Sequence, residues 1–370
     1  MIMITEANLP EQAQILALAG PKELTYIEQT LPRPGDRDIG VQTLYSGISH
    51  GTEMNVYRGK APQLTKYFDP DLRLFLPLPT EAVSHPPARG YWKPSDTTWG
   101  YPLAYGYANV GRVIECGPQV TGVRKGDLVF AYEPHQDYYV AAAETVIRLP
   151  ELTNPAEGVL FANLNTAYNG VLEANIRLDD VVVIFGQGIV GLLVTQFVRR
   201  VGPKQIIVVD TLPSRRRLAL SLGADIALDP AEGDIALQVR NMTNRRGADV
   251  VIEVSGSYTA LQEAIRTAAY NTSVVAMSWY GGTGQALKLS DEFHHNRISI
   301  KCSQVAGIAP ELSATHDIVR RTENVLAAFG ELQLSSLLTT AVPFNEAVQA
   351  YRLIDQHNEE IVQAVLSYTS

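Results

Sequence analysis

Residues 181–193, VVVIFGQGIVGLL, join an unbroken apolar run to a helix-like apolar pattern through Gly186, Gly188 and Gly191. An all-apolar strand is typical of a parallel sheet that is covered on both faces. In such a turn the first glycine allows a tight bend and the second lets a pyrophosphate approach the backbone. The third lets helix and strand pack closely. The stretch therefore predicts a strand–turn–helix unit that binds a dinucleotide.

The cofactor contacts that this motif predicts lie at the start of the helix and at the end of the next strand. The helix begins at Ile189 and Val190, and this end presents unpaired N–H groups and a positive dipole end to phosphates. Asp210 ends the next strand, where a carboxylate can bind the ribose hydroxyls and repels a 2′-phosphate. NAD is therefore favoured over NADP, although Arg215 and the two arginines after it could partly offset this preference. The alternative is a helix-capping turn that binds no ligand.

Around this motif, strands and helices alternate from about residue 156 onward, which predicts a doubly wound parallel sheet with right-handed crossovers. The preceding residues hold short β-prone pieces broken by glycine and proline, as in a β-rich domain. A chain of 370 residues also exceeds the size at which one hydrophobic core usually stops growing. We therefore expect an α/β protein with a Rossmann domain at residues 158–304 and a second domain at residues 1–157 and 305–370.

Residues 61–104 depart from the β-rich pattern because prolines alternate there with aromatic side chains. A disordered linker would be poorer in aromatic residues. We therefore expect an ordered, irregular excursion that packs on something. Our hypothesis is that it builds a lid or a pocket wall for a ring-bearing or polyol substrate.

Composition excludes several classes of protein. The net charge of −9 argues against nucleic acid or an anionic membrane as the main partner. Two cysteines are too few for a disulfide framework or a cysteine-built structural zinc site. The first twelve residues lack the basic start and apolar core of a signal peptide, and no apolar run reaches the length of about 18 residues that a membrane helix needs. We expect a cytoplasmic protein.

Over nearly all its length the chain resembles the medium-chain dehydrogenase/reductase superfamily, which includes the alcohol dehydrogenases. The matching stretches are residues 44–53, 106–129, 181–198, 208–225 and 249–256. The resemblance implies a GroES-like β domain that carries the substrate, a Rossmann domain, and an active site in the cleft between them. It also implies a homodimer joined through the last Rossmann strand, here residues 298–305.

The positions of the catalytic zinc ligands depart from this superfamily. The ligand cysteine is replaced by Ser49, the His-Glu pair by Tyr107 and Ala108, and the third ligand by Ala162. None of these supplies the thiolate or imidazole that zinc prefers. We therefore expect a zinc-free enzyme. It resembles a zinc-lacking branch of alcohol- and threonine-like dehydrogenases and, more distantly, the bacteriochlorophyllide dehydrogenases, which oxidise a hydroxyethyl group.

Without a metal, another group must bind the substrate oxygen and move its proton. The resemblance implies that the hydroxyl of Tyr107 lies where the metal would be, that Thr52 relays the alcohol proton, and that Glu53 is the acid beside it. His135 matches a pattern of the zinc-lacking branch, and histidine titrates in the right range for proton transfer. The structural alternatives are that Tyr107 fills the vacated cavity, that Glu53 is a buried structural acid, and that His135 is a core histidine.

Further positions are expected from the resemblance to contact the cofactor or the substrate. His50 matches a residue that touches the pyrophosphate, with a catalytic base as its alternative, and Thr166 matches one that packs on the nicotinamide. The remaining candidates are Ser278 for the cofactor and Trp279, Tyr280 and His294 for the substrate. His294 has a structural alternative, and its neighbour His295 is expected to face solvent.

The leading functional hypothesis is a zinc-independent, NAD-dependent dehydrogenase that acts on a secondary alcohol or polyol. One alternative is a quinone or enoyl reductase, because zinc-free members of the superfamily often reduce conjugated double bonds. Those enzymes usually prefer NADPH, which Asp210 disfavours. The second alternative is a dinucleotide-binding protein without turnover. Fold alone does not choose among them.

Overall fold

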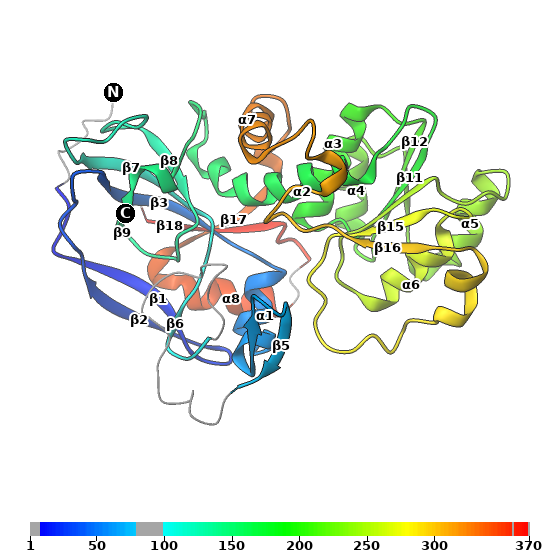
Figure 1. Ribbon diagram of the computed structural model, residues 1–370, viewed down its shortest axis with the longest axis horizontal. Helices are drawn as coiled ribbons and strands as arrows, with labels where there is room; N and C mark the ends of the chain where they lie inside the picture. The colour runs from blue at the N-terminus through cyan, green and yellow to red at the C-terminus, as the bar shows by residue number, and fades with distance from the viewer. Residues whose placement is uncertain (1–7, 79–98, 357–358, 369–370) are drawn as a thin grey trace. The chain divides into compact units, whose positions relative to one another are not determined.

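The computed structural model describes residues 8–78, 99–356 and 359–368, and the chain forms two compact units (Figure 1). The first unit consists of Met1–Phe161 and Leu338–Ser370, and the second of Ala162–Leu337. Antiparallel sheets dominate the first unit, and a six-stranded parallel sheet forms the second. The expected α/β fold, with a GroES-like and a Rossmann part, is confirmed. Among the described residues, no helix has both the length and the apolar character needed to cross a membrane.

The first unit is built around a large sheet in which the strands run in the order β10-β8-β7-β3-β18-β17, with β9 also paired to β3. A smaller sheet has the order β2-β1-β6, and β4 and β5 form a separate hairpin. The elements of this unit are β1 (Gln12–Gly20), β2 (Glu23–Thr30), β3 (Asp38–Ile48), α1 (Thr52–Tyr57), β4 (Lys66–Asp69), β5 (Leu74–Pro77), β6 (Leu103–Ala104), β7 (Asn109–Cys116), β8 (Leu128–Ala131), β9 (Tyr138–Ala142), β10 (Ile147–Arg148), β17 (Leu338–Pro343), α8 (Ala347–Asp355) and β18 (Gln363–Ser367).

Strand β3 holds the first unit together because it pairs with β7, β9 and β18, each of which runs antiparallel to it. Its side chains Ile39 and Val41 are fully buried in a core with Val113, Val129 and Tyr139. The last strand, β18, comes from the C-terminal end of the chain. Residues separated by most of the sequence therefore meet on β3.

The proline- and aromatic-rich excursion is described only in part. Its first half contains a 3₁₀ turn and the β4–β5 hairpin, in which the rings of Phe68 and Phe75 lie 5.1 Å apart. Residues 79–98 lie outside the described residues. The chain is described again from Trp99, whose indole is buried at 6% exposure. The hypothesis of a lid or a pocket wall stays a prediction.

The second unit has the strand order β13-β12-β11-β14-β15-β16, and all of these pairs are parallel. Helices α3 and α4 pack against β11, β12 and β13, whereas α6 packs against β11, β14 and β15 and also contacts α5 (Figure 1). The central strand β11 is buried along its whole length, as its apolar sequence predicts. The elements of this unit are α2 (Phe161–Ala174), β11 (Val181–Phe185), α3 (Ile189–Val201), β12 (Gln205–Val209), α4 (Pro213–Ser221), β13 (Ile226–Leu228), α5 (Ile235–Met242), β14 (Val250–Glu253), α6 (Tyr258–Thr267), β15 (Ser273–Ala276), a π-helical turn (Leu289–Phe293), β16 (Ser299–Cys302) and α7 (Ile318–Ala328).

The division between the units differs from the expected one, because residues 305–337 group with the second unit. The physical reason is Arg321 on α7, which is buried at 3% exposure. Its guanidinium donates to the carbonyls of Val305 at 2.8 Å and Gly307 at 2.9 Å, and to the side chain of Asn169 on α2 at 2.8 Å. These bonds fix the segment after β16 against helices of the second unit.

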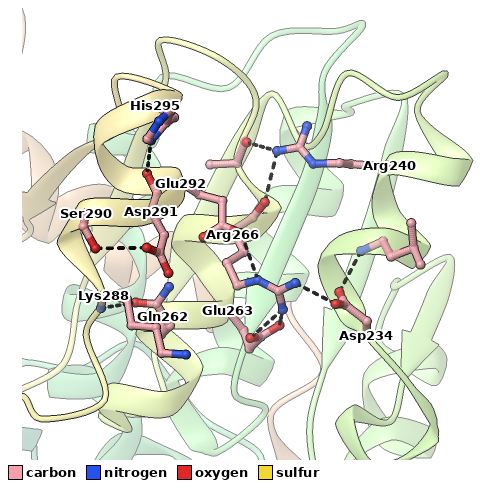
Figure 2. A network of polar contacts seen from close by, with 12 residues as sticks. Asp234, Arg240, Gln262, Glu263, Arg266, Lys288, Ser290, Asp291, Glu292 and His295 are labelled. Atoms are coloured by element: carbon pink, nitrogen blue, oxygen red, sulfur yellow. Dashed lines mark hydrogen bonds and ion pairs between the residues drawn. The ribbon is translucent and has the colours of Figure 1, made fainter.

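A network of charged side chains joins α5, α6 and the π-helical turn on the surface of the second unit (Figure 2). Arg266 on α6 donates to Asp234 at 2.6 Å, to both oxygens of Glu263 at 2.9 Å, and to Glu292 at 3.3 Å. Asp234 also caps α5 by accepting the N–H of Leu237. The bonds to Arg266 lower the pKa of Asp234 below its ordinary value.

We expect Arg266→Ala to lower the free energy of unfolding by roughly 1–2 kcal/mol, because it removes a guanidinium that three carboxylates share. Urea unfolding followed by circular dichroism measures this difference, which should shrink in 1 M salt. The control is Arg246→Ala, which removes one exposed pair with Asp249 at 3.5 Å and is expected to change stability by less than about 0.5 kcal/mol. If both variants lost the same free energy of unfolding, the three-carboxylate network would stabilise the protein no more than one exposed ion pair does.

Candidate active site

The glycine turn of the second unit has the geometry that its sequence predicts. Gly186 has a φ of +90°, and a Cβ there would lie 2.8 Å from Ser255. A Cβ on Gly191 would lie 2.0 Å from the carbonyl oxygen of Gly186. A Cβ on Gly188, in contrast, would meet no atom within 4 Å. Two glycines are thus needed for packing, and the one at the helix start leaves open space beside the backbone.

The start of α3 is suited to phosphate binding. Gly188 is the N-cap residue, and no side chain there accepts the first N–H groups of the helix, which begins at Ile189 and Val190. Unpaired N–H groups and the positive dipole end at such a terminus bind phosphate. The open space and the uncapped helix start together fit the pyrophosphate of a dinucleotide.

Asp210 lies directly after β12 and against the glycine turn. Its carboxylate accepts the N–H of Gln187 at 2.6 Å and the N–H of Leu212 at 2.8 Å. Arg216 donates to the main-chain carbonyl of Asp210 at 2.7 Å and pairs with Asp229 at 2.6 Å. A carboxylate fixed at this place can bind a ribose hydroxyl, and Arg216 is already engaged by another acid.

The other arginines after Asp210 have different surroundings. Arg215 is buried at 6% exposure on α4, where burial lowers its pKa while the nearby charge of Asp210 opposes that shift. Arg217 is exposed. The contact predicted between Arg215 and the cofactor stays a prediction.

The ends of β14 and β15 bring an acid against the glycine turn that the sequence did not single out. Glu253 is fully buried, and it accepts the N–H of Ser255 at 2.8 Å, the hydroxyl of Ser255, and the hydroxyl of Tyr280. Burial raises the pKa of Glu253, an effect that these hydrogen bonds oppose. Because Ser255 is the residue that Gly186 approaches, Glu253 helps to hold the turn. An acid that ends an otherwise apolar strand was the signal available in the sequence.

The remaining candidates of the second unit have these positions. Thr166 lies on α2 and donates to the carbonyl of Ala162 at 3.0 Å. Ser278 lies beside Gly256, and Trp279 is half-buried. His294 and His295 are exposed at the end of the π-helical turn, with their rings 5.5 Å apart. The exposure of His295 agrees with the solvent-facing position expected for it. The ligand contacts predicted for Thr166, Ser278, Trp279 and His294 stay predictions.

In the first unit, four candidates from three separate segments form one cluster. Thr52 and Glu53 begin α1, Tyr107 precedes β7, and His135 lies between β8 and β9. Nε2 of His135 is 2.8 Å from the carboxylate of Glu53, and both side chains are 1% exposed. The fifth candidate of this unit, His50, lies in the turn before α1 and is half-buried.

Tyr107 is half-buried, as is Thr52, and the side chains of Ser49 and Thr52 hydrogen-bond to Tyr107. Burial raises the pKa of Tyr107 to about 12, and the nearby charge of Glu53 adds to this shift. The phenol is therefore neutral at physiological pH. It can donate one hydrogen bond to a substrate oxygen while it accepts others from Ser49 and Thr52.

The cluster also contains groups that sequence reasoning missed. Nδ1 of His135 is 2.6 Å from the hydroxyl of Ser46 on β3, which is 2.8 Å from the hydroxyl of Tyr368. The hydroxyl of Tyr351 on α8 donates to Glu53. Ser46 and the two tyrosines carry no local pattern that marks them as functional, because the tyrosines come from the C-terminal segment.

The residues at the positions that the resemblance assigns to zinc ligands do not fit zinc. Ser49 and Tyr107 offer a hydroxyl and a neutral phenol, and Ala162 offers no donor atom, whereas zinc prefers thiolate, imidazole or carboxylate. Within residues 8–78, 99–356 and 359–368, no group of three or more His, Cys, Asp or Glu side chains is arranged to hold a metal ion. His135 and Glu53 are engaged with one another instead.

Comparison with known proteins agrees with this fold. Residues 190–321 match the family model described as zinc-binding dehydrogenase. This match lies within the second unit, and it agrees with the resemblance to medium-chain dehydrogenases that the sequence motifs indicate.

Particular relatives cover most of the chain. The D-guloside 3-dehydrogenase of Escherichia coli K12 is 28% identical over 90% of this chain and 93% of its own length. The 2-desacetyl-2-hydroxyethyl bacteriochlorophyllide A dehydrogenase of Rhodobacter capsulatus is 26% identical over 92% of this chain and 94% of its own length. The crystal structure of 2R,3R-butanediol dehydrogenase from Bacillus subtilis superposes with a TM-score of 0.75 at 17% identity, covering 96% of this chain and all of that chain.

Proposed function

We propose that this protein is an NAD-dependent dehydrogenase that transfers hydride between a secondary alcohol or polyol and nicotinamide without zinc. The observation that carries the proposal is the cluster in which Ser49 and Thr52 bond to Tyr107 beside the buried Glu53–His135 pair. These hydrogen-bonding groups include Ser49 and Tyr107, which occupy positions that the resemblance assigns to metal ligands. Such groups can bind an alcohol oxygen and move its proton.

The glycine turn supports NAD as the cofactor. Gly188 leaves room for the pyrophosphate, and the carboxylate of Asp210 lies where it can bind the ribose and repel a 2′-phosphate. When bound, the oxidised nicotinamide accepts the hydride. The protein's own groups then have to hold the substrate oxygen and take up the proton.

Tyr107 holds the substrate oxygen in this mechanism. Because burial raises its pKa to about 12, its hydroxyl keeps the proton at neutral pH and donates to the oxygen. In the direction of carbonyl reduction, this bond stabilises the negative charge that develops on the oxygen. In the direction of alcohol oxidation, the hydroxyls of Thr52 and Ser49 receive the proton from Tyr107 and pass it toward Glu53.

The names of two relatives support a polyol or a sugar derivative as the substrate. They are a guloside dehydrogenase and a sorbitol dehydrogenase of yeast. The rings of Tyr105 and Tyr107 are 6.4 Å apart, and those of Trp99 and Tyr105 are 5.5 Å apart. Because Tyr105 and Trp99 are buried, Tyr107 is the member of these three that a substrate can reach.

The test is turnover by protein from which metal has been removed with a chelator, with zinc content measured by mass spectrometry. NADH absorbance would be followed with secondary alcohols, sugar alcohols and glycosides, using NAD or NADP. We expect oxidation at an unchanged rate in the presence of chelator, and a kcat/KM at least about 100-fold higher with NAD than with NADP.

Other outcomes would replace the proposal. Activity that is lost with chelator and restored by added zinc would refute zinc independence. Turnover confined to quinones and enones would identify a reductase instead. Tight NADH binding without turnover on either panel would indicate a binding protein.

A further inference from the structure

The Glu53–His135 pair is almost fully buried, so the arrangement of its protons is restricted. Glu53 accepts the N–H of Ser49 at 2.9 Å, the hydroxyl of Tyr351, and Nε2 of His135 at 2.8 Å. Burying a charge is costly unless hydrogen bonds satisfy it. These three bonds require Glu53 to be the acceptor, which places a proton on Nε2 of His135.

The other ring nitrogen of His135 leads away from Glu53. With its proton on Nε2, a neutral imidazole has Nδ1 as an acceptor. Nδ1 then accepts the Ser46 hydroxyl at 2.6 Å, and Ser46 accepts the Tyr368 hydroxyl at 2.8 Å. In this series of hydrogen bonds, each O–H or N–H therefore points toward Glu53. A second proton on Nδ1 makes the ring a double donor and reverses the bonds to Ser46 and Tyr368.

Two contacts connect this series of hydrogen bonds to Tyr107. Gly106, with a φ of +132°, lies so close to the His135 ring that a Cβ there would be 2.9 Å from Cδ2 and 3.0 Å from Nε2. Ser49 hydrogen-bonds to Tyr107 through its side chain and to Glu53 through its N–H. The backbone before Tyr107 and the turn before α1 therefore both connect the phenol to the buried pair.

We propose that Glu53, His135, Ser46 and Tyr368 form a buried proton relay, in which His135 passes protons between Ser46 and Glu53 and Tyr368 exchanges them with solvent. The inference rests on the proposed function. In carbonyl reduction the hydride leaves nicotinamide for the carbonyl carbon, and the oxygen takes the proton of Tyr107. Tyr107 recovers a proton from Glu53 through the Ser49 and Thr52 hydroxyls as Nε2 of His135 gives its proton to Glu53. Nδ1 takes the proton of Ser46, which Tyr368 replaces, so the ring ends with its proton on Nδ1. Alcohol oxidation reverses each of these transfers, with the hydride going to nicotinamide.

The outer end of the relay is suited to exchange. Tyr368 is half-buried, and its ring stacks on Phe344 with centroids 4.4 Å apart. Burial raises the pKa of Tyr368 well above its ordinary value, so it passes protons as a neutral hydroxyl. Among the described residues, the titratable side chains that interact with members of the relay are one carboxylate and four tyrosines. They are Asp137, Tyr26, Tyr105, Tyr107 and Tyr351.

The experiment compares Tyr368→Phe and Ser46→Ala with Tyr26→Phe. The control removes a hydroxyl that bonds to the carbonyl of Phe344, beside the ring of Tyr368 but outside the relay. We expect the relay variants to lower kcat for alcohol oxidation about 10-fold and to increase its solvent deuterium isotope effect. The KM for NAD should stay unchanged in all three. If the relay variants match Tyr26→Phe, the relay is wrong and the proposed function stands.

A second measurement does not depend on turnover. Nitrogen-15 NMR of the imidazole groups would report the tautomer of His135 and the exchange rate of its ring protons with solvent. We expect the Nε2–H tautomer in the unmodified protein, and exchange slowed at least about 10-fold in Tyr368→Phe but not in Tyr26→Phe. An Nδ1–H tautomer, or equal exchange rates in both variants, would overturn the relay even if no alcohol were oxidised.

Discussion

Tyr107→Phe is expected to lower kcat/KM for alcohol oxidation about 100-fold, because it removes only the hydroxyl that holds the substrate oxygen. Binding of NADH, followed by fluorescence, should stay within about 3-fold of the unmodified protein, since the cofactor turn belongs to another part of the chain. The measurement is steady-state kinetics on the best substrate found in the turnover screen. It is most informative in both directions, because Tyr107 donates in one and accepts in the other.

The matched control for this variant is Tyr132→Phe. Tyr132 is 43% exposed and lies close enough to Tyr107 to contribute to the rise of the Tyr107 pKa. A loss of activity in Tyr132→Phe equal to that in Tyr107→Phe would assign the effect to general disturbance of this surface. Nearly full activity of Tyr107→Phe would leave this tyrosine as a residue that only fills space.

The raised pKa of Tyr107 also fixes the sign of a pH effect. A tyrosine whose pKa is about 12 keeps its proton up to and beyond pH 10. Reduction of a carbonyl, which needs that proton, should therefore not decline through loss of the Tyr107 proton between pH 7 and pH 10.

Gly191→Ala and Gly188→Ala are expected to separate packing from ligand binding at the glycine turn. A Cβ at 191 would lie 2.0 Å from the carbonyl oxygen of Gly186, so this variant should lose about 3 kcal/mol of unfolding free energy together with NAD binding. A Cβ at 188 meets no atom within 4 Å, and the φ of −69° there is ordinary for alanine. Gly188→Ala should therefore fold normally but bind NAD at least about 10-fold more weakly.

Urea unfolding and isothermal titration with NAD measure the two effects separately. The decisive result is the comparison between the variants, since both add the same methyl group to the same turn. If Gly188→Ala bound NAD as tightly as the unmodified protein, the open space beside that residue would not be where the pyrophosphate lies.

The sequence predicts those parts of the site that depend on local structure. The glycine turn, the helix α3 and Asp210 follow one another closely in the sequence. Spacing and apolar pattern were therefore enough to predict them. Tyr107, Glu53 and His135 were found through resemblance, and the structure brings all three into one cluster. What a pattern in one segment cannot show is which distant residue completes the site.

Tyr351, Tyr368 and the grouping of residues 305–337 illustrate that limit. Both tyrosines come from the C-terminal segment. Tyr368 follows β18, which pairs with β3 and so brings it to Ser46, whereas Tyr351 reaches Glu53 from α8. The boundary of the second unit depends on the buried contacts of Arg321, one of which reaches Asn169 at a separation of 152 residues in the chain. Long-range hydrogen bonds of this kind have no periodic signature.

The return of β17, α8 and β18 to the first unit has a consequence for how the chain is made. During synthesis, the second unit emerges from the ribosome as one continuous stretch and can fold while translation goes on. The first unit cannot complete its large sheet until β18 has been translated, and until then the edge of β3 that pairs with β18 stays exposed. The first unit, although it is translated first, is thus the last to finish folding. In the interval the unpaired edge of β3 is open to contacts with other nascent chains.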